Sequence, residues 1–122
     1  MQFTDFPGQE SAIQLLKGML SADRLPHALL FVGPEGCGKL GVALSLAQSI
    51  LCKEVDSEHH ACGVCNQCLK SKKLQHPDLH FSFPYVGKEY RSDDFVKDWK
   101  EAVLENPYLN YDLWSSILKV DN

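Results

Sequence analysis

One segment restricts the fold of this 122-residue chain more than any other, a glycine-rich loop before an apolar helical pattern. The loop fits the phosphate-binding P-loop (Walker A) pattern G-x-x-x-x-G-K. It consists of Gly33, Pro34, Glu35, Gly36, Cys37, Gly38, Lys39 and Leu40. In such loops, backbone N–H groups and the N-terminus of the following helix surround an anion, and the lysine adds positive charge. The sequence therefore predicts a phosphate- or nucleotide-binding site at residues 33–40.

Leu40 departs from this pattern at a chemically important position. The pattern ends in Ser or Thr, whose hydroxyl group holds Mg²⁺ beside the nucleotide, whereas a leucine side chain has no ligand atom. Because phosphoryl transfer depends on the metal, we assign no catalytic residue and expect no intrinsic ATPase activity. ATP or phosphate is expected to bind weakly.

The segments around the loop predict an α/β fold. Residues 27–32 are nearly all apolar, which is typical of a strand buried on both faces of a parallel sheet. After Lys39, apolar residues recur at helical spacing as far as Leu51. Residues 79–83 alternate between apolar and polar side chains up to Pro84, which predicts a second strand. We therefore expect a parallel sheet flanked by helices, as in P-loop NTPases.

Further helices are predicted on both sides of this unit. Apolar spacing indicates an amphipathic helix around residues 12–20, and another helix is expected to begin near Cys65. Ser92 and Asn110 are candidate N-caps of two later helices. Residues 85–91 are expected to form a surface loop. Trp99 and Trp114 occupy apolar helical positions and are predicted to lie in the core.

Four cysteines predict a metal site. They are Cys52, Cys62, Cys65 and Cys68, in the pattern C-x9-C-x2-C-x2-C. Two-residue spacings bring successive thiolates onto one Zn²⁺ ion, and four thiolates leave no open position, so the zinc would be structural. Residues 52–68 would then form an inserted zinc-binding module joining the end of one helix to the start of the next.

Other interpretations of the cysteines and histidines remain open. Redox-active or free cysteines are the alternatives to zinc; disulfides are disfavoured because the chain shows no signal peptide and intracellular thiols stay reduced. His59 and His60 would replace a thiolate only if one cysteine were unligated, and are otherwise expected to be solvated. Cys37 either fills a position of the loop or is a reactive thiol, and we favour the first interpretation.

The charge of the chain argues against strong DNA contact by this part alone. Twelve Lys and Arg residues oppose sixteen Asp and Glu residues, a net charge of −4. Four thiolates on one Zn²⁺ would contribute −4 + 2 = −2 more. Tight binding to nucleic acid requires a basic face, and the lysines at positions 70, 72 and 73 are better explained as a solvated helix face. No transmembrane span is evident.

Several segments, in this order, resemble the start of bacterial clamp-loader subunits of DNA polymerase III. They are residues 6–10, residues 24–31, the P-loop, the four cysteines and residues 76–80. The resemblance runs from about Phe3 to Pro84 and implies the N-terminal part of an AAA+ P-loop domain over residues 1–122. The acidic Walker B motif is expected beyond Asn122, because residues 117–121 are interrupted by Lys119 and continue a helical pattern.

Two kinds of subunit in this family carry a zinc module. ATP-hydrolysing gamma/tau subunits have Thr after the P-loop lysine, whereas delta-prime subunits often have a degraded loop, and Leu40 and residues 76–84 look like the second kind. The resemblance implies a cytoplasmic, non-motor subunit of the polymerase holoenzyme that helps load the sliding clamp onto primed DNA. Its partners would be the gamma/tau and delta subunits, with clamp and DNA reached through the assembled complex. The alternatives are a gamma/tau-type motor and a zinc-containing AAA+-like interaction module outside replication.

Overall fold

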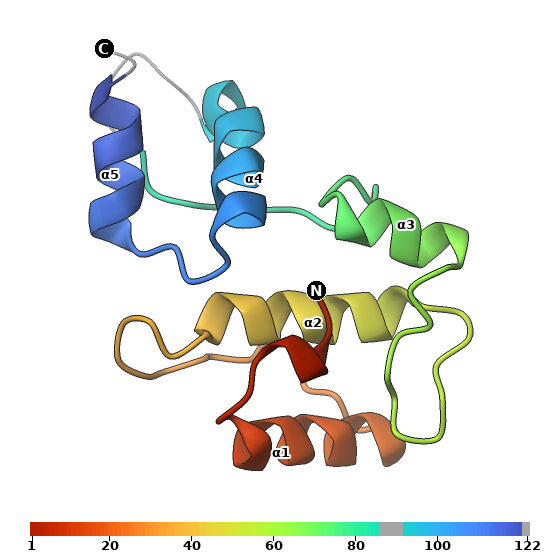
Figure 1. The fold of residues 1–122 in the computed structure, drawn as a ribbon. Helices are drawn as coiled ribbons and strands as arrows, with labels where there is room; N and C mark the ends of the chain where they lie inside the picture. Colours follow the sequence, from red (N-terminus) through yellow and green to blue (C-terminus); the bar gives the residue numbers. More distant parts are fainter. Residues whose placement is uncertain (86–91, 121–122) are drawn as a thin grey trace.

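The computed structural model describes residues 1–85 and 92–120, which form five α-helices and two short 3₁₀ helices. In chain order they are η1 (Phe3–Asp5), α1 (Glu10–Ser21), α2 (Lys39–Leu51), α3 (Asn66–Lys72), η2 (Ser92–Phe95), α4 (Val96–Glu105) and α5 (Tyr111–Val120). Figure 1 shows α1 beside α2, α3 near the C-terminal end of α2, and α4 and α5 side by side across the opposite face of α2.

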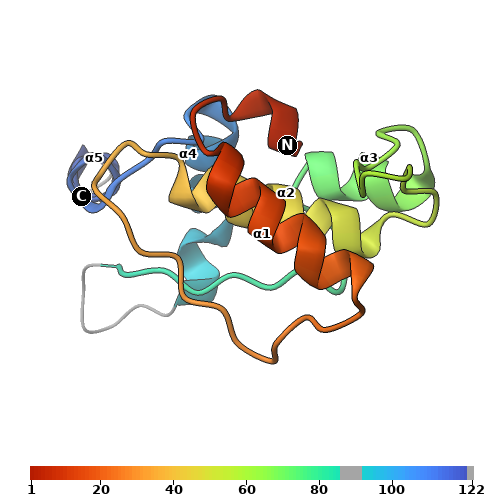
Figure 2. The same cartoon turned by 90° about the horizontal axis from the view of Figure 1, so that it is seen from below.

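The predicted parallel sheet is wrong for this structure, because the described part of the chain contains no β-strand. Residues 27–32 belong to a wide loop between α1 and α2, which Figure 2 shows at the edge of the molecule. Leu30 and Val32 are 88% and 83% exposed. A strand is stabilised by backbone hydrogen bonds to a neighbouring strand, and no described segment pairs with this one. The apolar run thus fits a strand in composition but lacks a partner.

The second predicted strand, residues 79–83, has the predicted alternation of side chains without the pairing. Phe83 is buried and Phe81 half-buried, whereas the intervening Ser82 is exposed. Both phenylalanines contact Trp99, with ring centroids 4.7 Å away for Phe81 and 5.2 Å away for Phe83. Trp114 Nε1 donates a hydrogen bond to the Pro84 carbonyl oxygen at 2.6 Å. This segment is therefore held by packing against helix side chains and not by hydrogen bonds to a neighbouring strand.

The helical predictions agree better with the structure. Helix α2 ends at Leu51 and α3 begins directly after Cys65, as expected. Asn110 caps α5, because its Oδ1 accepts a hydrogen bond from the Leu113 N–H at 2.8 Å. Residues 117–120 lie in this helix, so they do not form a catalytic strand. Ser92, by contrast, begins the 3₁₀ helix, and α4 starts four residues later at Val96. The expected loop at 85–91 lies, apart from Tyr85, outside the described residues.

Helix α2 is the central element because two apolar clusters meet on it. Leu44 belongs to a cluster that includes Val103, Trp99 and Trp114, so both tryptophans are core residues as predicted. On another side of the helix, Val42 and Leu46 pack into a second cluster. The other buried members of the second cluster are Phe3, Phe6, Ile13 and Leu16. A helix that is apolar on several sides is held by neighbours on each of them. Among the described residues, no helix is both long enough and apolar enough to cross a membrane.

Candidate metal centre and phosphate-binding loop

The four cysteines that the sequence singled out meet at the junction of α2 and α3. Cys52 is the C-cap of α2, Cys65 is the N-cap of α3, and Cys68 lies in the first turn of α3. Their three Sγ atoms and that of Cys62 all lie within 4.8 Å of one another. Four sulfurs on a tetrahedral zinc ion at 2.3 Å would be about 3.8 Å apart. Cys62 and Cys68 are separated by 3.9 Å, so the cluster can hold one metal ion.

A glycine makes the turn between two of these cysteines possible. Gly63 has φ +79°, a left-handed conformation that strongly favours glycine. Its carbonyl oxygen accepts a hydrogen bond from Lys72 Nζ at 2.7 Å, which ties the turn to the last residue of α3. The loop between Cys62 and Cys65 is therefore fixed by α3 and not only by its own sequence.

Backbone N–H groups surround the sulfur atoms. Cys52 Sγ accepts from the N–H groups of Glu54 and Cys62 at 3.4 and 3.3 Å. Cys62 Sγ accepts from the N–H of Cys65 at 3.3 Å, and Cys65 Sγ accepts from the N–H of Cys68 at 3.4 Å. Such donors stabilise thiolates, which are the form that binds metal. The turns at this junction thus prepare the sulfurs to carry negative charge.

The thiols differ in acidity. Backbone N–H groups, that of Lys53 first and then that of Cys68, lower the pKa of Cys65 to about 6. Burial is the largest influence on Cys68, and it raises the pKa of that thiol to about 12. Cys65 is therefore the more acidic of these two thiols, and Cys68 holds its proton more tightly. Metal binding at this centre must release the Cys68 proton.

His59 and His60 lie outside the sulfur cluster and bond to α1. Lys17 Nζ donates to His60 Nε2 at 3.0 Å, and Ser21 Oγ shares a hydrogen bond with His59 Nε2 at 2.9 Å. Both histidines are half-buried, so the expectation that they are simply solvated is wrong. Their contacts join the loop before Cys62 to the first long helix, which spacing in the sequence does not reveal.

The glycine-rich loop contains two residues in the left-handed backbone region. Gly36 and Gly38 both have positive φ angles, +77° and +94°, and Gly38 is the N-cap of α2. Lys39 Nζ donates to the Gly33 carbonyl oxygen at 2.7 Å, so the lysine side chain folds back across its own loop. A Cβ atom on Gly33 would stand 2.9 Å from Cys37 Sγ. This half-buried thiol therefore packs inside the loop.

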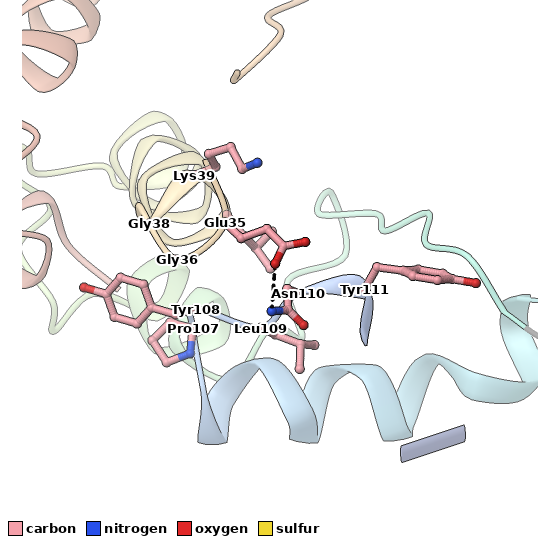
Figure 3. Close-up of a pocket in the computed structure, with 10 residues that line it drawn as sticks. Glu35, Gly36, Gly38, Lys39, Pro107, Tyr108, Leu109, Asn110 and Tyr111 are labelled. Atoms are coloured by element: carbon pink, nitrogen blue, oxygen red, sulfur yellow. Dashed lines mark hydrogen bonds between the residues drawn. The ribbon is translucent and has the colours of Figure 1, made fainter. Parts of the chain in front are cut away.

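Leu40 contributes packing where the motif would supply a hydroxyl group. It is half-buried and contacts the apolar cluster of Leu44 and Trp99. A pocket of about 320 Å³ lies between the loop and residues 107–111, and Leu40 helps to line it. Across this pocket, Asn110 Nδ2 donates to Glu35 Oε2 at 3.4 Å, as Figure 3 shows. Glu35 and Lys39 both line this pocket, so its wall includes one acidic and one basic residue.

This arrangement defines a class of protein, in which a glycine-rich loop of the P-loop pattern and a cluster of four cysteines stand at opposite ends of one helix. The family described as "DNA polymerase III, delta subunit" matches residues 8–112. The chain belongs to this family of clamp-loader subunits, as the resemblance in its sequence predicted.

Three relatives illustrate the range of similarity. DNA polymerase III subunit delta' of Bacillus subtilis is 42% identical over 76 residues, which are 62% of this chain and 22% of that protein. Subunit gamma/tau of Mycobacterium tuberculosis is 42% identical over 99 residues, 81% of this chain and 16% of that protein. Subunit tau of Escherichia coli is 38% identical over 77 residues, 63% of this chain and 12% of that protein. The chain thus spans about a fifth or less of these relatives' length. No solved structure matches it.

One buried polar residue, one helical turn before Cys52, was missed by the sequence analysis. Gln48 lies in α2 and is only 1% exposed, although it is polar. In the sequence Gln48 falls within an apolar helical pattern, and a single glutamine in such a pattern gives no indication that it is buried. The sequence did carry a signal: Gln48 lies four positions before Cys52, which places both residues on one face of the helix.

Proposed function

We propose that this chain forms part of a non-motor clamp-loader subunit of the delta-prime kind, which helps load the sliding clamp onto primed DNA during replication. The observation that carries the proposal is the environment of Leu40. Its side chain packs against the apolar cluster around Leu44 and offers no oxygen to a metal beside the loop. Membership of the clamp-loader family supplies the context. A subunit built in this way would support assembly and not supply energy from ATP.

Weak phosphate binding is consistent with the same site. The two left-handed glycines of the loop and Lys39 keep the backbone shape and one positive charge. Against these, an entering anion must displace the Lys39 bond to Gly33 and meet the Glu35 carboxylate on the pocket wall. We therefore propose that residues 33–40 bind phosphate or ATP weakly and without help from Mg²⁺.

The four cysteines support a structural zinc centre. The Sγ separations suit a tetrahedral ion, and soft thiolate ligands favour Zn²⁺ among common cellular divalent metals. With four protein ligands, no position would remain for substrate. Cys52, Cys62, Cys65 and Cys68 would then fasten the end of α2 to the start of α3, in a segment where few apolar residues are buried. We assign this centre a role in folding and not in chemistry.

The proposed partners follow from the family. They are the gamma/tau and delta subunits of the same complex, with the sliding clamp and primed DNA contacted through the assembly, in the cytoplasm. A gamma/tau-type motor subunit is the second candidate, because the gamma/tau relative aligns over a larger share of this chain than the delta' relative. An interaction module outside replication gains no support from the family match.

Reconstitution distinguishes the first two candidates. The full-length protein would be assembled with the gamma/tau and delta subunits of the same organism, the clamp and primed DNA. Lys39→Ala in this subunit alone is expected to leave both ATP hydrolysis and clamp loading by the complex unchanged. Loss of ATPase activity with intact assembly would identify a motor subunit instead, and failure to join the complex would contradict the clamp-loader role.

A further inference from the structure

A pocket of about 470 Å³ lies between the turn that follows α3 and the outer face of α4. None of the four clustered cysteines and no residue of the glycine-rich loop lines it. Its wall combines three lysines and one glutamate with two apolar side chains, and includes Lys73, Val96, Lys97, Lys100, Glu101 and Leu104. In a chain with a net charge of −4, this is a local excess of positive charge.

The turn after α3 fixes the backbone from which Lys73 reaches the pocket. Lys73 is the C-cap of α3, and the next residue, Leu74, has φ +56°, which is uncommon for residues other than glycine. Leu74 is nevertheless only 2% exposed, because its side chain packs in the same apolar cluster as Val103 of α4. Its N–H donates to the Ser71 carbonyl oxygen at 2.9 Å. The turn is therefore anchored both to α3 and to the core beneath α4.

Helix α4 has a buried face and a pocket face. Trp99 and Val103 are buried in the core. Lys97 and Leu104 are exposed and Lys100 is half-buried, and all three line the pocket. Because the core already holds the other side of the helix, the pocket face remains open to a ligand.

The three lysines keep their charge available. None of them forms an ion pair with a side chain in the described part of the chain. Lys100 Nζ lies 5.9 Å from the centroid of the Phe81 ring, near the outer limit of a cation–π contact. Glu101 offsets only one of the three charges. Like charges around one pocket repel one another, so a ligand that carries carboxylates would be attracted to it.

The two apolar side chains restrict the kind of ligand. Val96 and Leu104 are about two turns apart on α4, or about 12 Å along its axis. An extended peptide covers this distance with about four residues. Leu104 is 45% exposed and can lose apolar surface to a partner. The sugar–phosphate backbone of DNA would match the lysines but not these apolar groups, so the lining favours a peptide.

We propose that this pocket is a docking surface for an acidic, extended peptide segment of a partner protein. The carboxylates of the segment pair with Lys73, Lys97 and Lys100, and two apolar residues about four positions apart cover Val96 and Leu104. The inference goes beyond the proposed clamp-loader role and does not depend on the metal centre or on nucleotide binding.

The probe is a fluorescein-labelled synthetic peptide with two leucines four positions apart and aspartates at its other positions. Its binding to the full-length protein would be followed by fluorescence anisotropy. Lys97→Ala is expected to weaken binding about 2–5-fold, as the loss of an exposed charge pair does. Leu104→Ala is expected to weaken it about 3–10-fold through lost apolar contact. Glu101→Gln should strengthen binding about 2–5-fold, because it removes a repelling carboxylate.

Lys70→Ala is the matched control. Lys70 is exposed on α3 and carries the same charge, but it does not line the pocket. Its replacement should leave the affinity unchanged. A peptide with asparagines in place of the aspartates, and one with serines in place of the leucines, should each bind more weakly than the probe.

Three outcomes would overturn the inference. The first is wild-type affinity in both Lys97→Ala and Leu104→Ala, and the second is an equal loss in Lys70→Ala. The third is a labelled primed DNA that binds where the peptide does not, with a loss in Lys97→Ala and none in Leu104→Ala, which would identify a nucleic-acid contact instead. Circular dichroism would verify that each variant is folded.

Discussion

The ring of Phe6 lies directly against Gly41, so closely that no other residue type fits opposite it. A Cβ atom on Gly41 would stand 2.1 Å from both Cε1 and Cζ of the ring. Phe6 is buried and also meets Tyr108 edge to face, with ring centroids 5.8 Å apart. The segment before α1 is thereby anchored to the first turn of α2, immediately after the glycine-rich loop.

Gly41→Ala is therefore expected to destabilise the protein, although alanine favours helix formation. Moving a buried ring to admit a methyl group costs about 1–3 kcal/mol. Gly18→Ala is the control, because Gly18 lies within α1 and a Cβ atom there would meet nothing within 4 Å. That change should stabilise the protein by about 0.5–1 kcal/mol. Urea unfolding of both variants measures the change in the free energy of unfolding. Equal effects of the two changes would show that the Phe6 ring moves aside without a measurable cost.

The protein is expected to contain one tightly held zinc ion per chain. Structural zinc sites contribute about 10–16 kcal/mol of apparent binding free energy in small peptides. Elemental analysis of protein purified without added metal should find it, and Cys65→Ser should lower the zinc content. Hydrogen exchange in the Cys65→Ser variant should increase more in residues 52–68 than in α4. The prediction would be contradicted if the purified wild-type protein contained no metal and all of its thiols reacted with a thiol reagent.

Leu40→Thr alone is expected to produce no ATPase activity. The threonine hydroxyl would supply one ligand, whereas Mg²⁺ requires a nearly complete octahedral shell. Removing Leu40 also takes a half-buried side chain away from the apolar cluster that it contacts. Phosphate release would be compared with that of a Lys39→Ala variant, and turnover above that variant would disprove the prediction.

Nucleotide is expected to stabilise the wild-type protein only slightly. A ligand at 100 times its dissociation constant adds about 2.7 kcal/mol to the free energy of unfolding. Millimolar ATP with Mg²⁺ should give a much smaller shift in melting temperature, and inorganic phosphate should act about as well as ATP. A large shift that requires Mg²⁺ and disappears in Lys39→Ala would instead indicate a working ATP site.

Asn110→Ala is expected to lower the free energy of unfolding by about 0.5–2 kcal/mol, because α5 loses its N-cap. Asn110 also donates to Glu35 at 3.4 Å, but this bond is exposed and long. Glu35→Ala removes that second interaction alone and should have little effect. Thermal unfolding of both variants separates the two roles, and an equal loss in Glu35→Ala would assign the stability to the bridge across the pocket.

The sequence was most informative where neighbouring residues determine structure. Helix periodicity located α1 and α2, the side chain of Asn110 identified a cap, and the cysteine spacing identified side chains that do converge. These features depend on positions a few residues apart. The interpretation of residues 27–32 as a strand depended on a distant partner, which composition cannot supply.

Long-range contacts explain the other differences. The bonds of His59 and His60 to α1 join residues about 40 positions apart, and nothing in the local sequence indicates them. The alternation at residues 79–83 correctly indicated which side chains are buried, but Trp99 takes the place of a neighbouring strand there.

The continuity of α2 sets a phase relation between its two ends. The 13 residues from Lys39 to Leu51 form one uninterrupted helix, with Gly38 capping one end and Cys52 the other. Each residue of an α-helix turns the chain by about 100° and advances it by about 1.5 Å. Deleting a single residue between Gly38 and Cys52 would rotate the Cys52 sulfur by more than a quarter of a turn relative to the loop. The sulfur would then point away from the other three sulfurs. The number of residues in this helix is thus as much a determinant of the metal centre as the cysteines themselves.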